Sequence, residues 1–367
     1  MKIGYFMGHI GTSGGIKVVL QHLTLLREMG YEAVLLTRKI EGKLDVYGEW
    51  AEALTISRSD PLDDVPECDL FVGTTIRDVE YLFKHKRRKV VHLCQGYEPI
   101  KYMARIKKEF IQEKYLKGGI HSSIRQYLNV LKSKRKIKRV ESIYALPTVK
   151  AAVSKHLVEL IEKKYRQKCH LIQNGIDHRI FYHDEKRVWG ENGNIKILSV
   201  GSMQVGFKGI QDTLHAIKLL KDKGVKVDLT RVSPIPPSRK ELEGKIVDRF
   251  YEALSEKEMA NLYRNTDIFI SSSLEVEGFG LPAMEALASG APSILTEISS
   301  YKNFDEKMDF AYFVPTHRPD KIVEGILAFM EDKGLRENCI KNGLGVAKHY
   351  TLKITKEHLL KFMGEMV

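Results

Sequence analysis

The chain has 367 residues, of which 43% are apolar and 29% charged, the composition of a soluble globular protein. It is too long for one ordinary core, so we expect two domains. No apolar run approaches the roughly 18–20 residues of a membrane span, and the first residues read as a β-strand rather than a secretion signal. Four widely separated cysteines without a CxxC pair argue against disulfides and a structural zinc, and fit a cytoplasmic protein.

Positive charge is concentrated in one segment. The formal net charge is +12, and residues 101–140 contain thirteen Lys and Arg against two Glu. A solvated helix face normally alternates the two signs. The bias therefore indicates an anionic partner, which is membrane phospholipid, a phosphorylated substrate or nucleic acid.

The first half of the chain alternates short apolar runs with amphipathic segments. We expect strands at residues 2–7, 31–37, 69–73, 89–93, 151–154 and 170–173. Helices are expected between them, including residues 16–29 and 155–165, and the basic segment predicts one or two helices broken at Gly118-Gly119. This alternation indicates a parallel, doubly wound sheet.

The alternation restarts after a loop-like stretch at residues 174–194. Further strands are expected at residues 195–200, 225–232, 267–270, 292–295 and 310–314, and helices at 209–223, 254–263, 283–288, 319–331, 334–349 and 352–366. We therefore predict an α/β protein with domains at residues 1–173 and 174–351. Ligands of such sheets bind beyond the carboxyl ends of the strands, which places the site in the cleft between the domains.

The strongest candidate site is the strand–loop–helix segment at residues 266–296. Glu277 lies in its loop and Glu285 in its helix, with seven residues between them. The positive end of the helix dipole stabilises nearby carboxylates by about 0.3–1 kcal/mol, and free amides at a helix N-terminus bind anions. The structural alternative is that these carboxylates only cap the helix. It explains a single Glu better than it explains two Glu together with glycines on both sides of an aromatic residue.

The string EGFGLPAME, residues 277–285, resembles the E-x7-E signature of the family 4 retaining glycosyltransferases. These enzymes use nucleotide-sugar donors and have the GT-B fold, in which two Rossmann-like domains face each other across a cleft. The resemblance extends along most of the chain, through AVSKHL (152–157), NGID (174–177), GFKG (206–209) and GAP (290–292). The ordered set is more specific than any one of these pieces.

The resemblance implies roles for the donor side. Glu277 would contact the donor sugar near the reacting carbon, and Glu285 would bond the ribose hydroxyls of the nucleotide. Sugar hydroxyls and the diphosphate would be held by the backbone amides of Gly278, Phe279, Gly280 and Leu281. Retaining members of this fold are described as reacting by front-face attack, in which the donor phosphate helps to deprotonate the acceptor.

The cations of the donor site follow from the same resemblance. Lys208 matches the family lysine that pairs with the diphosphate. The family arginine is missing, because Ser202 follows Gly201, and we expect Arg231 at the end of the next strand to replace it.

Two features of the first half bear on the cleft. The loop before the first helix lacks GxGxxG spacing, but by the resemblance Gly14 and Gly15 would let that helix approach the donor phosphate. Gln95 occupies the position of a family histidine near the sugar. It is expected to bond the reactants without carrying a proton, whereas His92 is expected to be a core residue.

We expect neither a metal nor a cofactor, and the nucleotide-sugar is a substrate. The chain contains no Asp-x-Asp and no His/Cys/carboxylate cluster at metal-ligand spacing. Lys208, backbone amides and helix ends would then neutralise the leaving group.

The basic segment has two interpretations of equal weight. Aromatic and aliphatic residues interleave with its lysines, which is typical of an interfacial amphipathic helix, but a helix packed on the first sheet with one solvated face has the same pattern. By the resemblance the first half binds the acceptor, so its charge fits a phosphate-bearing or lipid-linked acceptor and a peripheral location on the inner membrane face. No nucleic-acid motif accompanies the charge.

The sequence therefore predicts a metal-independent retaining glycosyltransferase that moves a sugar to a hydroxyl acceptor such as a cell-envelope glycan. Glu277 and Gln95 are the predicted catalytic residues. The alternatives are a non-catalytic binder of anionic membrane or nucleic acid on the same fold, a sugar phosphorylase and a nucleotide-sugar epimerase. The nucleotide base, the sugar and the acceptor depend on loops that the motifs do not define.

Overall fold

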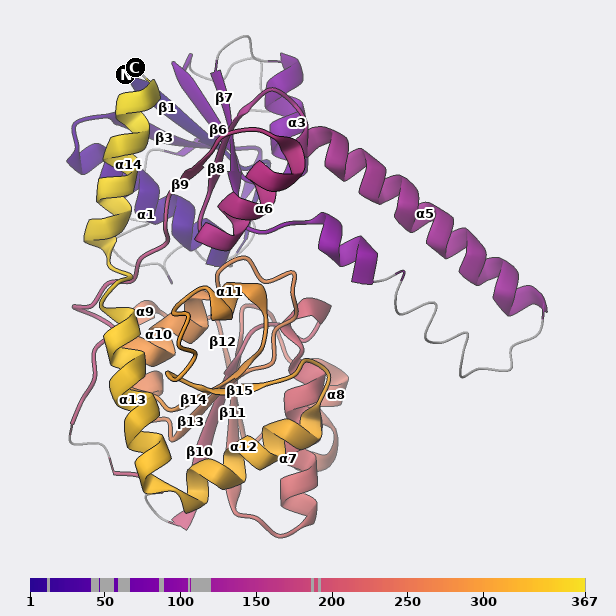
Figure 1. Ribbon diagram of the computed structural model, residues 1–367, viewed down its shortest axis with the longest axis vertical. Helices are drawn as coiled ribbons and strands as arrows, with labels where there is room; N and C mark the ends of the chain where they lie inside the picture. Colours follow the sequence, from indigo (N-terminus) through magenta and orange to yellow (C-terminus); the bar gives the residue numbers. More distant parts are fainter. Residues whose placement is uncertain are drawn as a thin grey trace.

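The computed structural model describes residues 1–11, 14–40, 46, 56–58, 67–85, 89–104, 106, 120–185, 188–190 and 193–366. They form two α/β units stacked along the long axis of the molecule (Figure 1). Each unit is built on its own parallel sheet. The predicted doubly wound α/β fold is confirmed.

The first unit has a seven-stranded sheet. Its strands, in spatial order, are β5 (Ile56–Arg58), β3 (Glu32–Thr37), β1 (Lys2–Phe6), β6 (Leu70–Gly73), β7 (Lys89–Cys94), β8 (Val149–Ala152) and β9 (Cys169–Leu171). The helices of this unit are α1 (Gly14–Glu28), α3 (Ile76–His85), α5 (Ile120–Tyr144) and α6 (Lys155–Tyr165), and the short strands β2 (His9–Ile10) and β4 (Lys39–Ile40) form a separate pair. Central strands such as β1 are nearly continuous buried apolar runs, because helices cover both faces of a parallel sheet.

The second unit has a six-stranded sheet. Its strands, in spatial order, are β12 (Arg249–Glu252), β11 (Val227–Ser233), β10 (Ile195–Val200), β13 (Ile268–Ser271), β14 (Ser293–Thr296) and β15 (Tyr312–Val314). Its helical segments are η4 (Gly206–Lys208), α7 (Ile210–Asp222), α8 (Arg239–Leu242), η5 (Glu243–Lys245), α9 (Glu256–Arg264), α10 (Leu281–Ala288), α11 (Ser299–Lys302), α12 (Pro319–Glu331) and α13 (Lys333–Ala347). The sequence did not predict the edge strand β12, because RFYE is largely exposed and has no apolar run.

The chain passes between the units twice. It leaves the first sheet after β9 and enters the second at β10, and after α13 it returns as α14 (Leu352–Met366), which packs against α1. The two passages touch where Ile176 bridges Thr351. A side chain at Gly175 would collide with the Thr351 carbonyl, so the crossing requires glycine there.

Apolar packing is continuous across the junction of the units. One cluster of buried residues runs from strands of the first sheet to Phe279, Leu281 and other residues of α10 in the second unit. The ends of the strands that face the junction are therefore held against each other, which is where ligands of such sheets bind.

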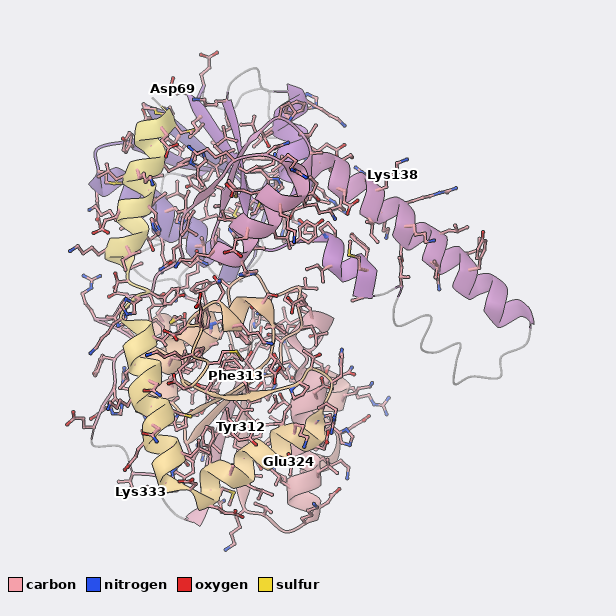
Figure 2. All side chains as sticks on the ribbon, viewed as in Figure 1. Asp69, Lys138, Tyr312, Phe313, Glu324 and Lys333 are labelled. Carbon is pink, nitrogen blue, oxygen red and sulfur yellow. The ribbon has the colours of Figure 1, made fainter. Side chains whose placement is uncertain are left out.

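Helix α5 projects away from both units (Figure 1). Its base packs on α3, where Arg139 forms an ion pair with Glu80 at 2.9 Å. Residues 132–139 contain six exposed cations, and Lys138 lies on the free part of the helix (Figure 2). The predicted helix break at Gly118-Gly119 lies outside the described residues. Within the described ranges no helix has the length and apolar content needed to span a bilayer.

Candidate active site

The loop between β13 and α10 is shaped by two glycines. Gly280 has φ 91° and a side chain there would collide with the Tyr301 ring, while a side chain at Gly278 would collide with the Gln95 carbonyl of the first unit. Helix α10 has no side-chain N-cap. Within the described part of the chain, the backbone NH groups of residues 278–281 have no hydrogen-bond acceptor. They are free to bind an anion at the positive end of the helix.

Glu277 forms an ion pair within the second unit. Its Oε2 accepts hydrogen bonds from Lys208 Nζ at 2.6 Å and from Ser273 Oγ at 3.1 Å. The Lys208 side chain is 21% exposed and that of Glu277 is 11% exposed. Gly209, with φ 63°, follows Lys208 and lies against the Ser272 backbone. The structure therefore brings together two of the predicted donor residues at the start of two helices.

Glu285 forms an ion pair between the units. Its Oε1 lies 2.6 Å from Lys17 Nζ, on α1 of the first unit, and its Oε2 accepts from Tyr263 OH at 3.1 Å. Lys17 also lies 2.6 Å from Glu256. Burial lowers the pKa of the Lys17 ammonium, whereas Glu285 and Glu256 raise it, and the net pKa stands above the usual lysine value. Both carboxylate oxygens of Glu285, the predicted ribose ligand, are thus bonded to protein groups.

The sequence prediction missed Lys17. The residue is a cation within the otherwise buried apolar start of α1, two positions after the glycine-rich loop. Its position is a usable signal, because a buried lysine requires an anionic partner. The partner, however, is 268 residues away and no local pattern identifies it.

The glycine-rich loop and Gln95 meet the second unit at α10. Gly14 begins α1, and a side chain at this position would touch Leu281. Gln95 follows β7, and its Nε2 donates to the Gly15 carbonyl at 3.1 Å. The predicted first-unit residues Gly14, Gly15 and Gln95 therefore lie together at the cleft edge of the second unit.

The prediction for Arg231 is wrong for this structure. Arg231 is fully buried, and its guanidinium donates to the Ser199 and Gly201 carbonyls and to Glu241 Oε1 at 3.2 Å. Burial lowers the pKa of Arg231 to about 10, against the opposing effect of Glu241. The residue anchors α8 to the end of β10, so its charge is neutralised inside the protein and not presented to a ligand.

Two further predicted residues lie in the core or at its edge. His92 is buried, its ring centroid lies 4.6 Å from that of Tyr144, and burial lowers its pKa to about 3. It is a core residue, as expected. Phe279 buries its ring against Phe304 and Tyr350, which leaves only its backbone NH for a ligand.

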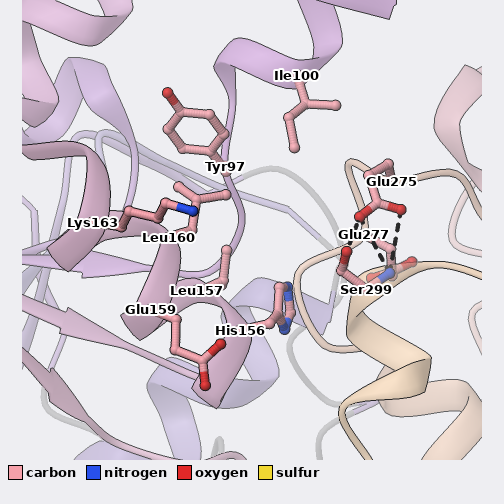
Figure 3. A pocket seen from close by; sticks show the side chains of 10 residues that line it. All are labelled: Tyr97, Ile100, His156, Leu157, Glu159, Leu160, Lys163, Glu275, Glu277 and Ser299. Carbon is pink, nitrogen blue, oxygen red and sulfur yellow. Dashed lines mark hydrogen bonds between the residues drawn. The ribbon is translucent and has the colours of Figure 1, made fainter.

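A cavity of about 360 Å³ lies between the units beside Glu277. Its lining residues are Tyr97, Ile100, His156, Leu157, Glu159, Leu160, Lys163, Glu275, Glu277 and Ser299. In Figure 3 the first unit supplies the apolar side chains, and the second supplies Glu275, Glu277 and Ser299. Glu275 accepts hydrogen bonds from the backbone NH and the hydroxyl of Ser299, at the start of α11.

The fold and this site define a class of protein: a GT-B-type α/β protein whose cleft holds two carboxylates, two lysines and the free amides of a helix N-terminus. Residues 182–345 match the model of the family described as glycosyl transferases group 1. The match contains Lys208, Glu277 and Glu285. It supports assigning this segment, the core of the second unit, to that family.

Curated relatives match only part of the chain. The MMP alpha-(1->4)-mannosyltransferase of Mycolicibacterium hassiacum is 32% identical over 133 residues, which are 35% of this chain and 31% of that protein. The phosphatidyl-myo-inositol mannosyltransferase of Mycobacterium tuberculosis is 20% identical over 117 residues, 31% of each chain. The chain thus spans about a third of the length of the curated relatives that it matches.

Solved structures resemble the chain over its full length. The sucrose-phosphate synthase of Thermosynechococcus elongatus has a TM-score of 0.72 at 16% identity and covers 100% of this chain and 99% of its own. The Anabaena HepE protein, solved with UDP and glucose, has a TM-score of 0.73 at 12% identity and covers 99% of both chains. At these identities the likeness shows the fold alone, and it confirms the GT-B architecture.

Proposed function

We propose that this protein is a retaining glycosyltransferase that moves a sugar from a nucleoside diphosphate to a hydroxyl acceptor. One observation carries the proposal. Glu277, Lys208, Glu285 and the free amides of residues 278–281 surround the N-terminus of α10 at the junction of the units. They lie in the segment that matches glycosyl transferases group 1.

The donor is held by this second unit. The amides and Lys208 bind the diphosphate, and Glu277 faces the sugar. Glu285 bonds the ribose in addition to Lys17 and Tyr263, because each carboxylate oxygen can accept more than one hydrogen bond. Lys208 and Glu277 neutralise each other when no donor is present. Diphosphate binding draws Lys208 away, which frees Glu277 to stabilise the positive charge that develops on the reacting carbon.

The reaction follows the front-face course of family 4 enzymes and needs no metal or cofactor. The acceptor oxygen bonds to the carbon on the face from which the diphosphate departs, and the proton of the acceptor passes to the diphosphate. The fixed donors at α10 and Lys208 stabilise the charge of the leaving group. Gln95, tied to the Gly15 carbonyl, orients the reactants.

Residues 1–173, with helix 352–366, form the acceptor-binding domain, and residues 174–351 form the donor-binding domain. The exposed cations of α5 support an anionic surface as a partner, and a cytoplasmic enzyme peripheral to the inner membrane face fits it. Two of the curated relatives described above are named mannosyltransferases, which makes mannose a first candidate for the transferred sugar and a cell-envelope glycan a candidate acceptor.

Thermal unfolding with a panel of UDP, GDP, ADP, CDP and dTDP tests the donor site. A ligand that binds only the folded state raises its stability by about 2.7 kcal/mol at a concentration of 100 Kd. We expect one nucleotide to raise Tm in the parent and to lose most of this effect in Glu285→Ala. No shift with any nucleotide would overturn the proposal and favour a non-catalytic binder.

Transfer assays with the matching nucleotide-sugar then separate the enzyme classes. A glycosyltransferase releases nucleotide in proportion to the glycoside that it forms, with the anomeric configuration retained, and its rate survives EDTA. A requirement for inorganic phosphate indicates a phosphorylase. A changed sugar without acceptor indicates an epimerase.

A further inference from the structure

The cavity beside Glu277 has walls of two kinds. Tyr97 and Ile100, which follow β7, and Leu157 and Leu160 of α6 provide an apolar wall, and Glu159 and Lys163 of α6 add charged groups on the same side. Glu275, Glu277 and Ser299 line the facing side, from the second unit (Figure 3). A ligand that fills this cavity therefore needs an apolar part against α6 and a polar part against Glu277.

His156 stands at the boundary between the two walls (Figure 3). Its backbone NH donates to Asn303 Oδ1 at 3.3 Å, which fixes the first turn of α6 against the second unit. Its Nδ1 is buried and has no hydrogen-bond partner among the described residues. A buried ring nitrogen without a partner is costly, and because His156 lines the cavity, a rotation of its ring brings a nitrogen within reach of a ligand hydroxyl.

The imidazole of His156 is suited to accept a hydrogen bond from such a hydroxyl. Burial lowers its pKa to about 4, with Glu275 acting in the opposite direction. The ring is therefore neutral near pH 7, and one of its nitrogens is an acceptor.

We infer that this cavity binds the acceptor through an apolar group on the α6 wall, and that His156 accepts a hydrogen bond from an acceptor hydroxyl beside Glu277. The acceptor is then an amphipathic compound, a sugar or polyol joined to an alkyl or aryl group. Calling this ligand the acceptor rests on the proposed function. The predicted preference of the cavity for amphipathic ligands does not depend on that function. Leu160 and His156 are its specificity-determining residues.

Binding of octyl and methyl β-D-glucopyranoside to the full chain tests the apolar wall. Each buried methylene contributes about 0.8 kcal/mol, so we expect octyl glucoside, kept below its micelle concentration, to bind at least about tenfold more tightly than the methyl compound. Saturation-transfer NMR should place the octyl chain on the protein. Phenyl β-D-glucopyranoside in a parallel series distinguishes an aryl from a flexible alkyl group. Equal affinities of all three compounds would overturn the inference.

Four variants locate the binding preference in the cavity. Leu160→Gln should remove the octyl preference, and His156→Ala should weaken both glucosides, with recovery in His156→Asn, which restores an acceptor. Leu128→Gln is the matched control, because Leu128 is an exposed leucine on α5. If Leu160→Gln keeps the preference, or if Leu128→Gln loses it, the cavity is not the site.

The nucleotide-induced rise in Tm separates this inference from the proposed function. All four variants should keep the parent response to the nucleotide. A nucleotide response without an octyl preference overturns the acceptor inference alone. An octyl preference without any nucleotide response leaves the cavity as an amphiphile site and overturns the glycosyltransferase.

Discussion

The two units share one architecture but bring different chemistry to their junction. The second unit carries Lys208 in η4, directly after β10, and Glu277 and Glu285 around α10, directly after β13. The first unit contributes scattered residues, including Lys17 on α1 and His156 on α6. The comparison teaches that each residue of the proposed donor side lies in a short, recognisable stretch of sequence. The first unit completes the site only through contacts made by folding.

The largest expected effect on activity comes from a substitution in the second unit, at Glu277. In Glu277→Gln the carboxylate that we propose faces the developing positive charge is lost while the shape of the side chain remains. We expect kcat to fall by about 10²–10³, the range found for loss of one preorganised electrostatic group, with nucleotide affinity nearly unchanged. Initial rates and a nucleotide titration measure both.

Glu275→Gln is the matched control for that change. Glu275 lies two residues earlier in the same loop and is bonded to Ser299. Because Glu275 also lines the proposed acceptor cavity, kcat is compared at saturating acceptor, where it should stay close to the parent value. Equal losses in the two variants would mean that the charge of the loop, and not the position of Glu277, matters.

The next effect compares the two lysine–glutamate pairs. Lys17→Met leaves Glu285 and Glu256 without their cation, where the Lys17 and Glu285 side chains are only 9% and 8% exposed. Breaking a buried pair costs about 3–5 kcal/mol. Lys208→Met breaks a pair whose side chains are 21% and 11% exposed, and it should cost less than Lys17→Met because solvent reaches the remaining carboxylate more easily. Urea unfolding at constant m-value measures both, and equal losses would contradict the contrast between the units.

Acid should loosen the first unit before the second. His22, His92 and His156 all belong to the first unit, and burial lowers their pKa values to about 3, 3 and 4. The unfolded chain, with histidine pKa near 6.5, binds more protons below that pH, so stability is complete above pH 6.5 and falls toward pH 4. Between pH 6.5 and 5.5 the loss is on the order of 1 kcal/mol for each histidine.

Hydrogen exchange measured by mass spectrometry locates this acid effect. Peptides of β1, β6 and β7 should exchange faster at pH 5.5 than at pH 7, after correction for intrinsic rates, while β10 and β13 change less. His349→Gln, at an exposed histidine of the second unit, should leave the profile unaltered. If acidification instead accelerated exchange more in β10 and β13 than in β1, β6 and β7, the prediction that the first unit is more acid-sensitive would be wrong.

The smallest effect tests a single bond across the junction. Ser154 Oγ donates to the Gly278 carbonyl at 3.0 Å in a buried position, and Ser154→Ala should cost about 0.5–1.5 kcal/mol in urea unfolding. Ser142→Ala removes a bond within exposed α5 and is the control. A larger loss in Ser142→Ala would show that the junction bond contributes little.

The parts of the structure that could be predicted from the sequence are divided in the same way, between local segments and contacts made by folding. The β13–loop–α10 segment was predicted within about two residues of its observed bounds, because its signals are local: an apolar run, two glycines, a proline and a small-residue helix. Lys208 was predicted from the family resemblance of the string GFKG at residues 206–209. The two-domain α/β class followed from the alternation of elements, and the α10 site from the positions of its glycines.

Contacts distant in sequence were not predictable in this way. An arginine at the end of a strand looks the same whether it faces a ligand or, like Arg231, pairs with Glu241 beneath α8. Lys17 becomes informative only once α1 is placed against α10. The cavity next to His156 exists only because α6 meets the loop of Glu275, and no stretch of sequence contains both sides.

The return of α14 to α1 has a consequence for the order of folding during synthesis. Lys356 of α14 pairs with Glu28 of α1, so the first helix of the chain receives its outer neighbour only after the whole second unit has been translated. At about 5–20 residues per second this delay is on the order of twenty seconds to a minute. Throughout that interval the face of α1 that α14 later covers stays open to solvent.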